Sequence, residues 1–389
     1  MKTVDLVYFD AGGGHRAAAL ALQEAIALQQ RPWRVRLVNL TEVVDPGGSL
    51  RRATGIDPEA LYNRRLARGW TLGMAQELKL LQGLIRLAHG TLVRTLQQHW
   101  LRSEPDLVVS LIPNFNRALY ESLASALPGV PYATVLTDMA DLPPRFWIEP
   151  GQEQHLVCGT PRAVEQARAA GYRSDQLSLT SGMVLHPSFH APLRVDRALE
   201  LPALGLDPAR PTGLVLFGGQ GSMQMLRIAK ALQERQLILL CGRNEALAEA
   251  LRRLKRPAPH AALGFTREVS RLMALSDWFI GKPGPASLSE AVRRGLPVLT
   301  FENAWTLPQE RFNAHWVRET GVGRVVRSLK ALPAAVDQLL QDLPRHRERV
   351  AAIDNRAVFE VPGILAGLLR RADAPPPAAA LRRARAADA

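Results

Sequence analysis

The stretch ALSDWFIGKPGPASLSEAVRRGLPVLTFENAWTLPQERFN, residues 274–313, decides the fold. Residues 276–280 predict a short buried strand, residues 287–294 a helix and residues 296–300 the next strand. Glycines and prolines at 281–285 break the chain between the first strand and the helix. Parallel strands joined by a helix place both following loops at the carboxyl edge of one sheet, where open α/β sheets bind ligands.

The residues of these two loops suit a nucleotide. Gly284 lets the backbone approach a phosphate, and the helix that begins at Ser287 offers free N–H groups and a positive dipole end to an anion. Glu290, one turn inside that helix, is placed to accept hydrogen bonds from two ribose hydroxyls. An ordinary βαβ unit with turn glycines is the alternative. The long, ordered spacing from the glycines to Glu290 and then to Gln309 and Glu310 favours a ligand site.

Each half of the chain opens with a strand, glycines and a helix. Residues 4–9 predict a strand that leads into Gly12, Gly13, Gly14 and His15, and residues 214–217 predict a strand that leads into the glycines at 218–221. Two Rossmann-like domains are therefore expected. The first loop lacks the G-x-G-x-x-G spacing and the Lys-Ser/Thr of a P-loop. A tight turn would usually need one glycine, so three favour the close approach of a ligand.

Two carboxylates follow another predicted strand, at residues 132–136. Asp138 and Asp141 lie just past its end, on the same sheet edge as the triple glycine, where they suit acid–base chemistry.

The motifs GKPGPASLSEAVRRGLPVL, PQERFN and GGGHRAAA resemble those of family 28 glycosyltransferases, and are closest to the monogalactosyldiacylglycerol and diglucosyldiacylglycerol synthases. The resemblance extends over nearly the whole chain. It implies a GT-B fold: an α/β architecture of two Rossmann-like domains that face an interdomain cleft. It also implies an inverting, metal-independent transfer of a hexose from a nucleotide sugar, UDP-linked, to a hydroxyl of a lipid such as diacylglycerol. We expect no cofactor and no metal site.

The resemblance assigns roles to particular residues. The residues expected to bind the donor nucleotide are Gly219, Gln220, Gly221, Ser222, Arg243, Phe265, Gly284, Ser287 and Glu290. Gln309 and Glu310 are expected to bind the hydroxyls of the donor sugar. Either His15 or Asp138 is expected to deprotonate the acceptor.

The loop of Gly12, Gly13 and Gly14 is expected to contact a phosphate or the acceptor. Relatives often carry a His and then an aromatic pair after the Thr-Asp. Here Phe146 and Trp147 match the pair, but the His is missing.

The expected organisation has five segments. They are an N-terminal acceptor domain at 1–190, a linker at 191–211, a donor domain at 212–345, C-terminal helices at 346–371 that can cross back to the first domain, and a disordered tail at 372–389.

The composition indicates which surfaces and which cellular compartment suit the chain. With 389 residues and a net charge of +13, carried almost entirely by arginine, the chain should be drawn to anionic surfaces or phosphorylated ligands. A genome rich in Ala and Arg codons would give the same charge. Cys158 and Cys241 are isolated, which fits a reducing compartment. With no signal peptide and no membrane-spanning run visible, we expect a cytoplasmic protein, peripheral on the inner face of the cell membrane.

Residues 61–101 form the most basic helical stretch. Its arginines and lysine, with tryptophans near the ends, suit an anionic membrane surface, whereas a packed helix pair with a solvated basic face is the alternative. The basic and tryptophan residues are Arg64, Arg65, Arg68, Lys79, Arg86, Arg94, Trp70 and Trp100.

Two other functions remain open. A nucleotide-sugar epimerase of similar fold would need no lipid and would show further acid–base residues in the C-terminal half. The charge alone suggests nucleic-acid binding, but no recognisable module is present, so no nucleic-acid partner is expected.

Overall fold

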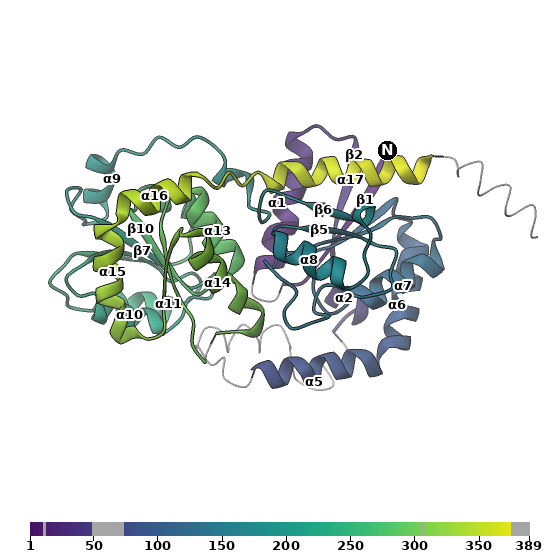
Figure 1. The fold of residues 1–389 in the computed structure, drawn as a ribbon, viewed down its shortest axis with the longest axis horizontal. Coiled ribbons are helices and arrows are strands. Elements are labelled where there is room, and N and C mark those ends of the chain that lie inside the picture. The colour runs from purple at the N-terminus through teal and green to yellow at the C-terminus, as the bar shows by residue number, and fades with distance from the viewer. Residues whose placement is uncertain (11–12, 49–73, 305, 375–389) are drawn as a thin grey trace, which may run out of the picture.

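The computed structural model describes residues 1–10, 13–48, 74–304 and 306–374. Two six-stranded sheets, both wholly parallel, form the centres of two domains (Figure 1). This confirms the predicted pair of Rossmann-like α/β halves.

The N-terminal sheet has the strand order β2-β1-β3-β4-β5-β6. Its strands are β1 Lys2–Tyr8, β2 Trp33–Asn39, β3 Leu107–Ser110, β4 Tyr132–Val135, β5 His155–Cys158 and β6 Leu177–Leu179. The helices of this half are α1 Gly14–Leu28, α2 Leu40–Val44, α5 Met74–Leu87, α6 His89–Ser103, α7 Asn116–Ala126 and α8 Pro161–Ala169.

The C-terminal sheet has the strand order β12-β11-β10-β7-β8-β9. Its strands are β7 Thr212–Leu216, β8 Gln236–Leu240, β9 His260–Leu263, β10 Trp278–Gly281, β11 Val298–Phe301 and β12 Gly323–Val326. The helices are α9 Arg197–Ala203, α10 Gln224–Ala231, α11 Glu245–Arg252, α12 Val269–Ala274, α13 Pro285–Arg293, α14 Arg311–Thr320, α15 Leu332–Gln341, α16 Leu343–Ala351 and α17 Ala357–Asp373.

Helices cover both faces of the C-terminal sheet. Because side chains alternate along a strand, Val215 and Leu239 join a core with α10, α11 and α15, while Leu214 and Ile238 join a second core on the opposite face. The strands are buried on both faces, and for this reason they are continuous apolar runs in the sequence.

Both sheets reverse their strand order at one point. The reversal falls between β1 and β3 in the first domain and between β7 and β10 in the second. Open α/β sheets bind ligands beyond the carboxyl ends of the strands at such a point. The glycine loops after β1 and β7 therefore lie where ligands are expected.

The last helix, α17, lies along the N-terminal domain, as the yellow ribbon of Figure 1 shows. Val358, Val361 and Leu365 pack in the same core as Val4 and Leu6 of β1. The chain thus returns to the first domain after the second one is complete. The helix ends at Asp373, two residues into the predicted tail. The domain and linker boundaries given above stay predictions.

The basic stretch at 61–101 is described only from residue 74 onwards, so Arg64, Arg65, Arg68 and Trp70 lie outside the described residues. It forms two helices, α5 and α6. The expectation that Trp100 marks a membrane interface is wrong, because this side chain is fully buried and its indole donates a hydrogen bond of 2.9 Å to Ser122. In the described ranges no helix is both long and apolar enough to cross a bilayer.

Candidate active site

The glycine loop after β7 packs against the loop after β8. The backbone N–H of Arg243 donates to the Gly219 carbonyl at 2.9 Å. Gly221 has φ +61°, and a Cβ there would lie 2.5 Å from the Cys241 carbonyl oxygen, so only glycine fits. Around Gly219 itself the space is open to 4 Å, which leaves its backbone accessible to a ligand.

The loop after β10 lies beside this glycine loop. A Cβ on Gly218 would lie 3.9 Å from Cε of Lys282. The loop is fixed by Asn313, whose Nδ2 donates to the Pro283 carbonyl at 2.7 Å. Gly284 then caps α13 with its backbone alone, and Pro285 opens the helix. No acidic residue lies in its first turn, and the nearest carboxylate oxygen at this helix end is Oε1 of Glu310, 3.7 Å from where a Cβ on Gly284 would be.

Glu290 lies one turn into α13. Burial raises the pKa of its carboxyl to about 7. Across the described ranges its carboxylate has neither a hydrogen bond nor an ion pair. A half-buried acid without a partner inside the protein is suited to bind a polar ligand. Ser287, predicted to face the phosphate, is buried and places its hydroxyl 3.3 Å from the Gly284 carbonyl.

Glu310 ends the short 3₁₀ helix η3, Pro308–Glu310, and is buried. It forms an ion pair of 2.5 Å with Nζ of Lys282. Gln309 beside it is half-buried. The two residues predicted to bind the donor sugar therefore lie next to the predicted phosphate loop, although one of the Glu310 oxygens is already occupied by the lysine.

The loops after β8 and β9 carry two more of the predicted nucleotide residues, Arg243 and Phe265. The guanidinium of Arg243 lies 5.4 Å from the centre of the Phe265 ring, and the ring is 59% exposed. An exposed aromatic face beside a cation at a sheet edge is suited to a planar, polar group.

In the N-terminal domain, His15 lies in the first turn of α1, after the triple glycine. Its Nδ1 is 3.0 Å from the Thr137 hydroxyl, beyond the end of β4. Burial lowers the pKa of His15 to about 4, against the opposing effect of a hydrogen bond with the Leu111 backbone. His15 is therefore neutral at physiological pH.

Of the three loop glycines, Gly13 and Gly14 are exposed, and Gly12 lies outside the described residues.

Asp138 follows Thr137 and is only 8% exposed. Its Oδ2 accepts a 2.9 Å hydrogen bond from the indole N–H of Trp147. Burial raises the pKa of Asp138 to about 7, while the indole opposes this rise. Glu310 raises that pKa further and Lys282 lowers it, so charges of the C-terminal domain act on this carboxylate. The structure thus brings the predicted base and the predicted donor residues together from opposite domains.

Asp141, the other acid of the predicted pair, is held by the backbone. Its oxygens accept hydrogen bonds from the N–H groups of Trp147 at 2.6 Å and Arg145 at 3.0 Å. Both oxygens are in use, so Asp141 fixes the loop after Asp138, and only Asp138 of this pair is available for proton transfer.

Three residues of the site have no role in the sequence prediction. They are Lys282, Asn313 and Trp147. Lys282 lies within the quoted glycine motif, at a strand end, and that position is the signal that could have identified it. Nothing in the sequence shows that Trp147 contacts Asp138, because the nine-residue step between them contains no helix or strand whose period would place the two side chains together.

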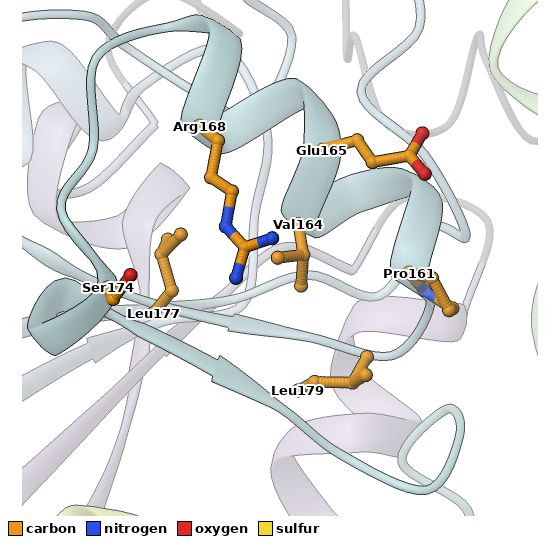
Figure 2. Close-up of a pocket in the computed structure, with 7 residues that line it drawn as sticks. All are labelled: Pro161, Val164, Glu165, Arg168, Ser174, Leu177 and Leu179. Carbon is orange, nitrogen blue, oxygen red and sulfur yellow. The ribbon is translucent and has the colours of Figure 1, made fainter.

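A pocket of about 260 Å³ lies elsewhere, between α8 and the edge strand β6. Figure 2 shows its lining side chains, which include Val164, Arg168 and Leu179. No predicted site residue lines it. In the part of the chain that the structure describes, no group of three or more His, Cys, Asp or Glu side chains is placed to hold a metal.

The two facing Rossmann-like domains define a class: the chain has the GT-B fold of glycosyltransferases. A solved structure of the calicheamicin glycosyltransferase CalG4 superposes with a TM-score of 0.62 at 15% identity, covering 96% of this chain and all of that one. At this identity the likeness shows the fold alone.

Sequence relatives are more specific. The chain is 25% identical over 366 residues to monogalactosyldiacylglycerol synthase 1, chloroplastic, of Arabidopsis thaliana, a match that covers 86% of this chain and 64% of the relative. It is 27% identical over 248 residues to the processive diacylglycerol beta-glucosyltransferase of Staphylococcus carnosus (strain TM300), covering 62% of this chain and 61% of that protein. The chain thus spans a little under two thirds of the length of these relatives.

No protein-family profile matches the chain. The resemblance to galactolipid and glucolipid synthases that the motifs predicted is nevertheless confirmed by these relatives.

The raised pKa of the half-buried Glu290 carboxyl predicts that the free energy of unfolding falls as this group ionises. The pKa of Glu290 is about 7 in the folded protein, against the ordinary 4.5 of an exposed carboxyl. Between these two pH values the carboxyl is therefore protonated in the folded protein and ionised in the unfolded chain. Glu290→Gln and the parent should be equally stable near pH 4. The variant should gain about 1–3 kcal/mol over the parent as pH rises through about 7. Denaturant unfolding at both pH values measures this, and parallel curves for the two proteins would contradict it.

Proposed function

We propose that the chain is a hexosyltransferase that moves a sugar from a nucleotide sugar, UDP-linked, to a hydroxyl of a lipid acceptor such as diacylglycerol. One observation carries the proposal: Asp138 of the first domain lies within electrostatic reach of Lys282 and Glu310 of the second. A titratable acid thereby lies near the lysine that adjoins the glycine loop after β7 and the start of α13, and a transfer reaction needs both a base and a site for the leaving group.

The donor half suits a diphosphate. The N-terminus of α13, the accessible backbone of Gly219 and the ammonium of Lys282 converge at the β7/β10 switch point. They supply backbone N–H groups, a dipole end and a positive charge to stabilise the leaving diphosphate. This supports the metal-independent mechanism that the motifs imply.

The remaining donor groups suit the nucleoside and the sugar. Glu290 presents a carboxylate that has no hydrogen bond or ion pair to any residue that the structure describes, and it can accept hydrogen bonds from the ribose diol. Phe265 and Arg243 offer a surface for the base, and the half-buried Gln309 an amide for the sugar hydroxyls.

The acceptor half supplies the base. A general base works best when its pKa lies near the operating pH, which favours Asp138, at about 7, over His15, at about 4. Asp138 takes the proton of the acceptor hydroxyl as the hydroxyl oxygen forms its bond to the anomeric carbon. The bond from that carbon to the diphosphate oxygen breaks, and the nucleoside diphosphate leaves with the electron pair. Attack opposite the leaving group inverts the anomeric centre.

A lipid acceptor is supported by the relatives and by α5. One relative is named as a monogalactosyldiacylglycerol synthase and the other as a diacylglycerol glucosyltransferase. On α5, Leu80, Leu84 and Leu87 are exposed by 66%, 54% and 86%, at helical spacing, with Lys79 and Arg86 exposed beside them. Apolar side chains flanked by cations match an anionic membrane surface. We therefore infer a peripheral protein on the cytoplasmic, inner face of the membrane.

The two alternatives have less support. The sequence relatives reported above are glycosyltransferases, and a likeness of fold alone does not favour an epimerase. Nucleic-acid binding rests on the net charge of +13 and on nothing else in the described site.

A donor and acceptor screen tests the function. We expect transfer from UDP-sugars in preference to GDP- and dTDP-sugars, onto diacylglycerol in vesicles, with activity kept in EDTA. Glu290→Ala should weaken binding of the free nucleoside diphosphate by about 1.5–3 kcal/mol, because a charge-assisted hydrogen bond is lost. Calorimetry measures this affinity.

The control is Glu348→Ala, which removes an exposed carboxylate of α16 in the same domain. It should bind nucleotide like the parent. Unchanged affinity in a folded Glu290→Ala protein would remove the ribose assignment, and transfer that stops in EDTA and returns with Mg²⁺ would contradict the metal-independent mechanism.

The membrane proposal predicts sedimentation with anionic vesicles at low salt and release as salt rises, because screening weakens the attraction. Replacing Leu84 and Leu87 with Ser should reduce binding at least about tenfold. Leu199→Ser is the matched control, since Leu199 is 71% exposed on the C-terminal domain. Equal binding to anionic and neutral vesicles, or no difference between the two variants, would speak for a soluble acceptor.

A further inference from the structure

Trp147 makes a polar contact that the sequence does not show. Its side chain is fully buried, and its indole N–H donates to Oδ2 of Asp138 at 2.9 Å. Across the described residues, the other carboxylate oxygen, Oδ1, has no hydrogen-bond partner, and Asp138 keeps a small exposed area. The contact therefore uses one oxygen of the candidate base and leaves the second one free.

Hydrogen bonds to the backbone N–H and to the backbone carbonyl of Trp147 fix the position of its indole. The backbone N–H of Trp147 donates to Asp141 at 2.6 Å, and the backbone carbonyl accepts from Nδ2 of Asn116 at 3.0 Å. Asn116 is in turn fixed by the hydroxyl of Tyr132, which donates to its Oδ1 at 2.9 Å. Strand β4, helix α7 and the loop after Asp138 thus all contribute to the direction of one N–H group.

The ring also touches the second candidate base. The ring centres of Trp147 and His15 lie 5.9 Å apart, with the planes tilted by 54°. Trp147 therefore contacts both candidate bases, His15 through its ring and Asp138 through its indole N–H.

We propose that Trp147 is a positioning residue for the transfer reaction, whose indole N–H fixes the Asp138 carboxylate with Oδ1 directed to the acceptor hydroxyl. The inference rests on the proposed function, because it gives Asp138 the part of the base. A hydrogen bond to a carboxylate stabilises the ionised form, so the indole also helps to keep this buried acid able to accept a proton. Phenylalanine at 147 would fill most of the same space but could not donate.

Trp147→Phe is the direct test. The loss of the donor should shift the acidic limb of the pH–rate profile to higher pH and lower kcat at neutral pH by roughly tenfold or more, with KM for the nucleotide sugar unchanged. Trp100→Phe is the matched control, because Trp100 is equally buried in the same domain and also loses an indole hydrogen bond of 2.9 Å. It should keep the profile of the parent. A Trp147→Phe profile identical to the parent, or the same shift in both variants, would overturn the proposal.

A spectroscopic measurement separates this inference from the proposed function. With ¹⁵N-labelled tryptophan, the indole resonance that disappears in Trp147→Phe should move with pH as Asp138 titrates, and should stop moving in Asp138→Asn. If the parent transfers no sugar but this resonance titrates, the proposed function fails and the pairing of Trp147 with Asp138 stands. A resonance that ignores both pH and Asp138→Asn overturns the pairing, whatever the activity.

Discussion

The pKa of one buried carboxylate, that of Asp138, depends on charges that lie across the boundary between the two domains. Asp138 belongs to the N-terminal sheet, yet Lys282 and Glu310 of the C-terminal domain change its pKa. Each parallel sheet reverses its strand order beside a glycine loop, and Asp138, Lys282 and Glu310 all lie in segments that follow strands. The return of α17 to the first domain, where Val358 and Leu365 join the core of β1, ties the two halves together.

The ion pair between Lys282 and Glu310 balances one positive charge with one negative charge near this boundary. Glu310 places a negative charge beside this lysine, which lies between a helix N-terminus and a glycine loop. A diphosphate would bring negative charge to the same place and compete with Glu310 for the ammonium. Donor binding would then leave Glu310 freer to meet the sugar hydroxyls, the part that the motif assigns to it. The same two charges act on the pKa of Asp138, so under the proposed function donor binding would change the proton affinity of the candidate base.

The sequence predicts the fold well, because apolar strands followed by glycines and helices occur at the start of each half and again at residues 276–300. Spacing also selects Glu290 as a candidate ligand residue, because it lies one turn inside the helix that follows the glycine break, and its role stays a prediction. Spacing does not predict the contacts of Trp147 and Asn313, because their partners lie nine and thirty residues away across loops. It also misjudges Trp100, because a tryptophan near the end of a basic helix has the same sequence signature whether it meets lipid or core. Only packing distinguishes these two cases.

The central claim is that the second domain binds the donor and the first supplies the base. A single-turnover measurement on Asp138→Asn, combined with calorimetry of nucleoside diphosphate binding, tests it most directly. The account predicts that nucleotide affinity stays at the parental value while the transfer rate falls by about a hundredfold or more. Transfer at the parental rate, or a loss of nucleotide affinity as large as the loss of transfer, would contradict it.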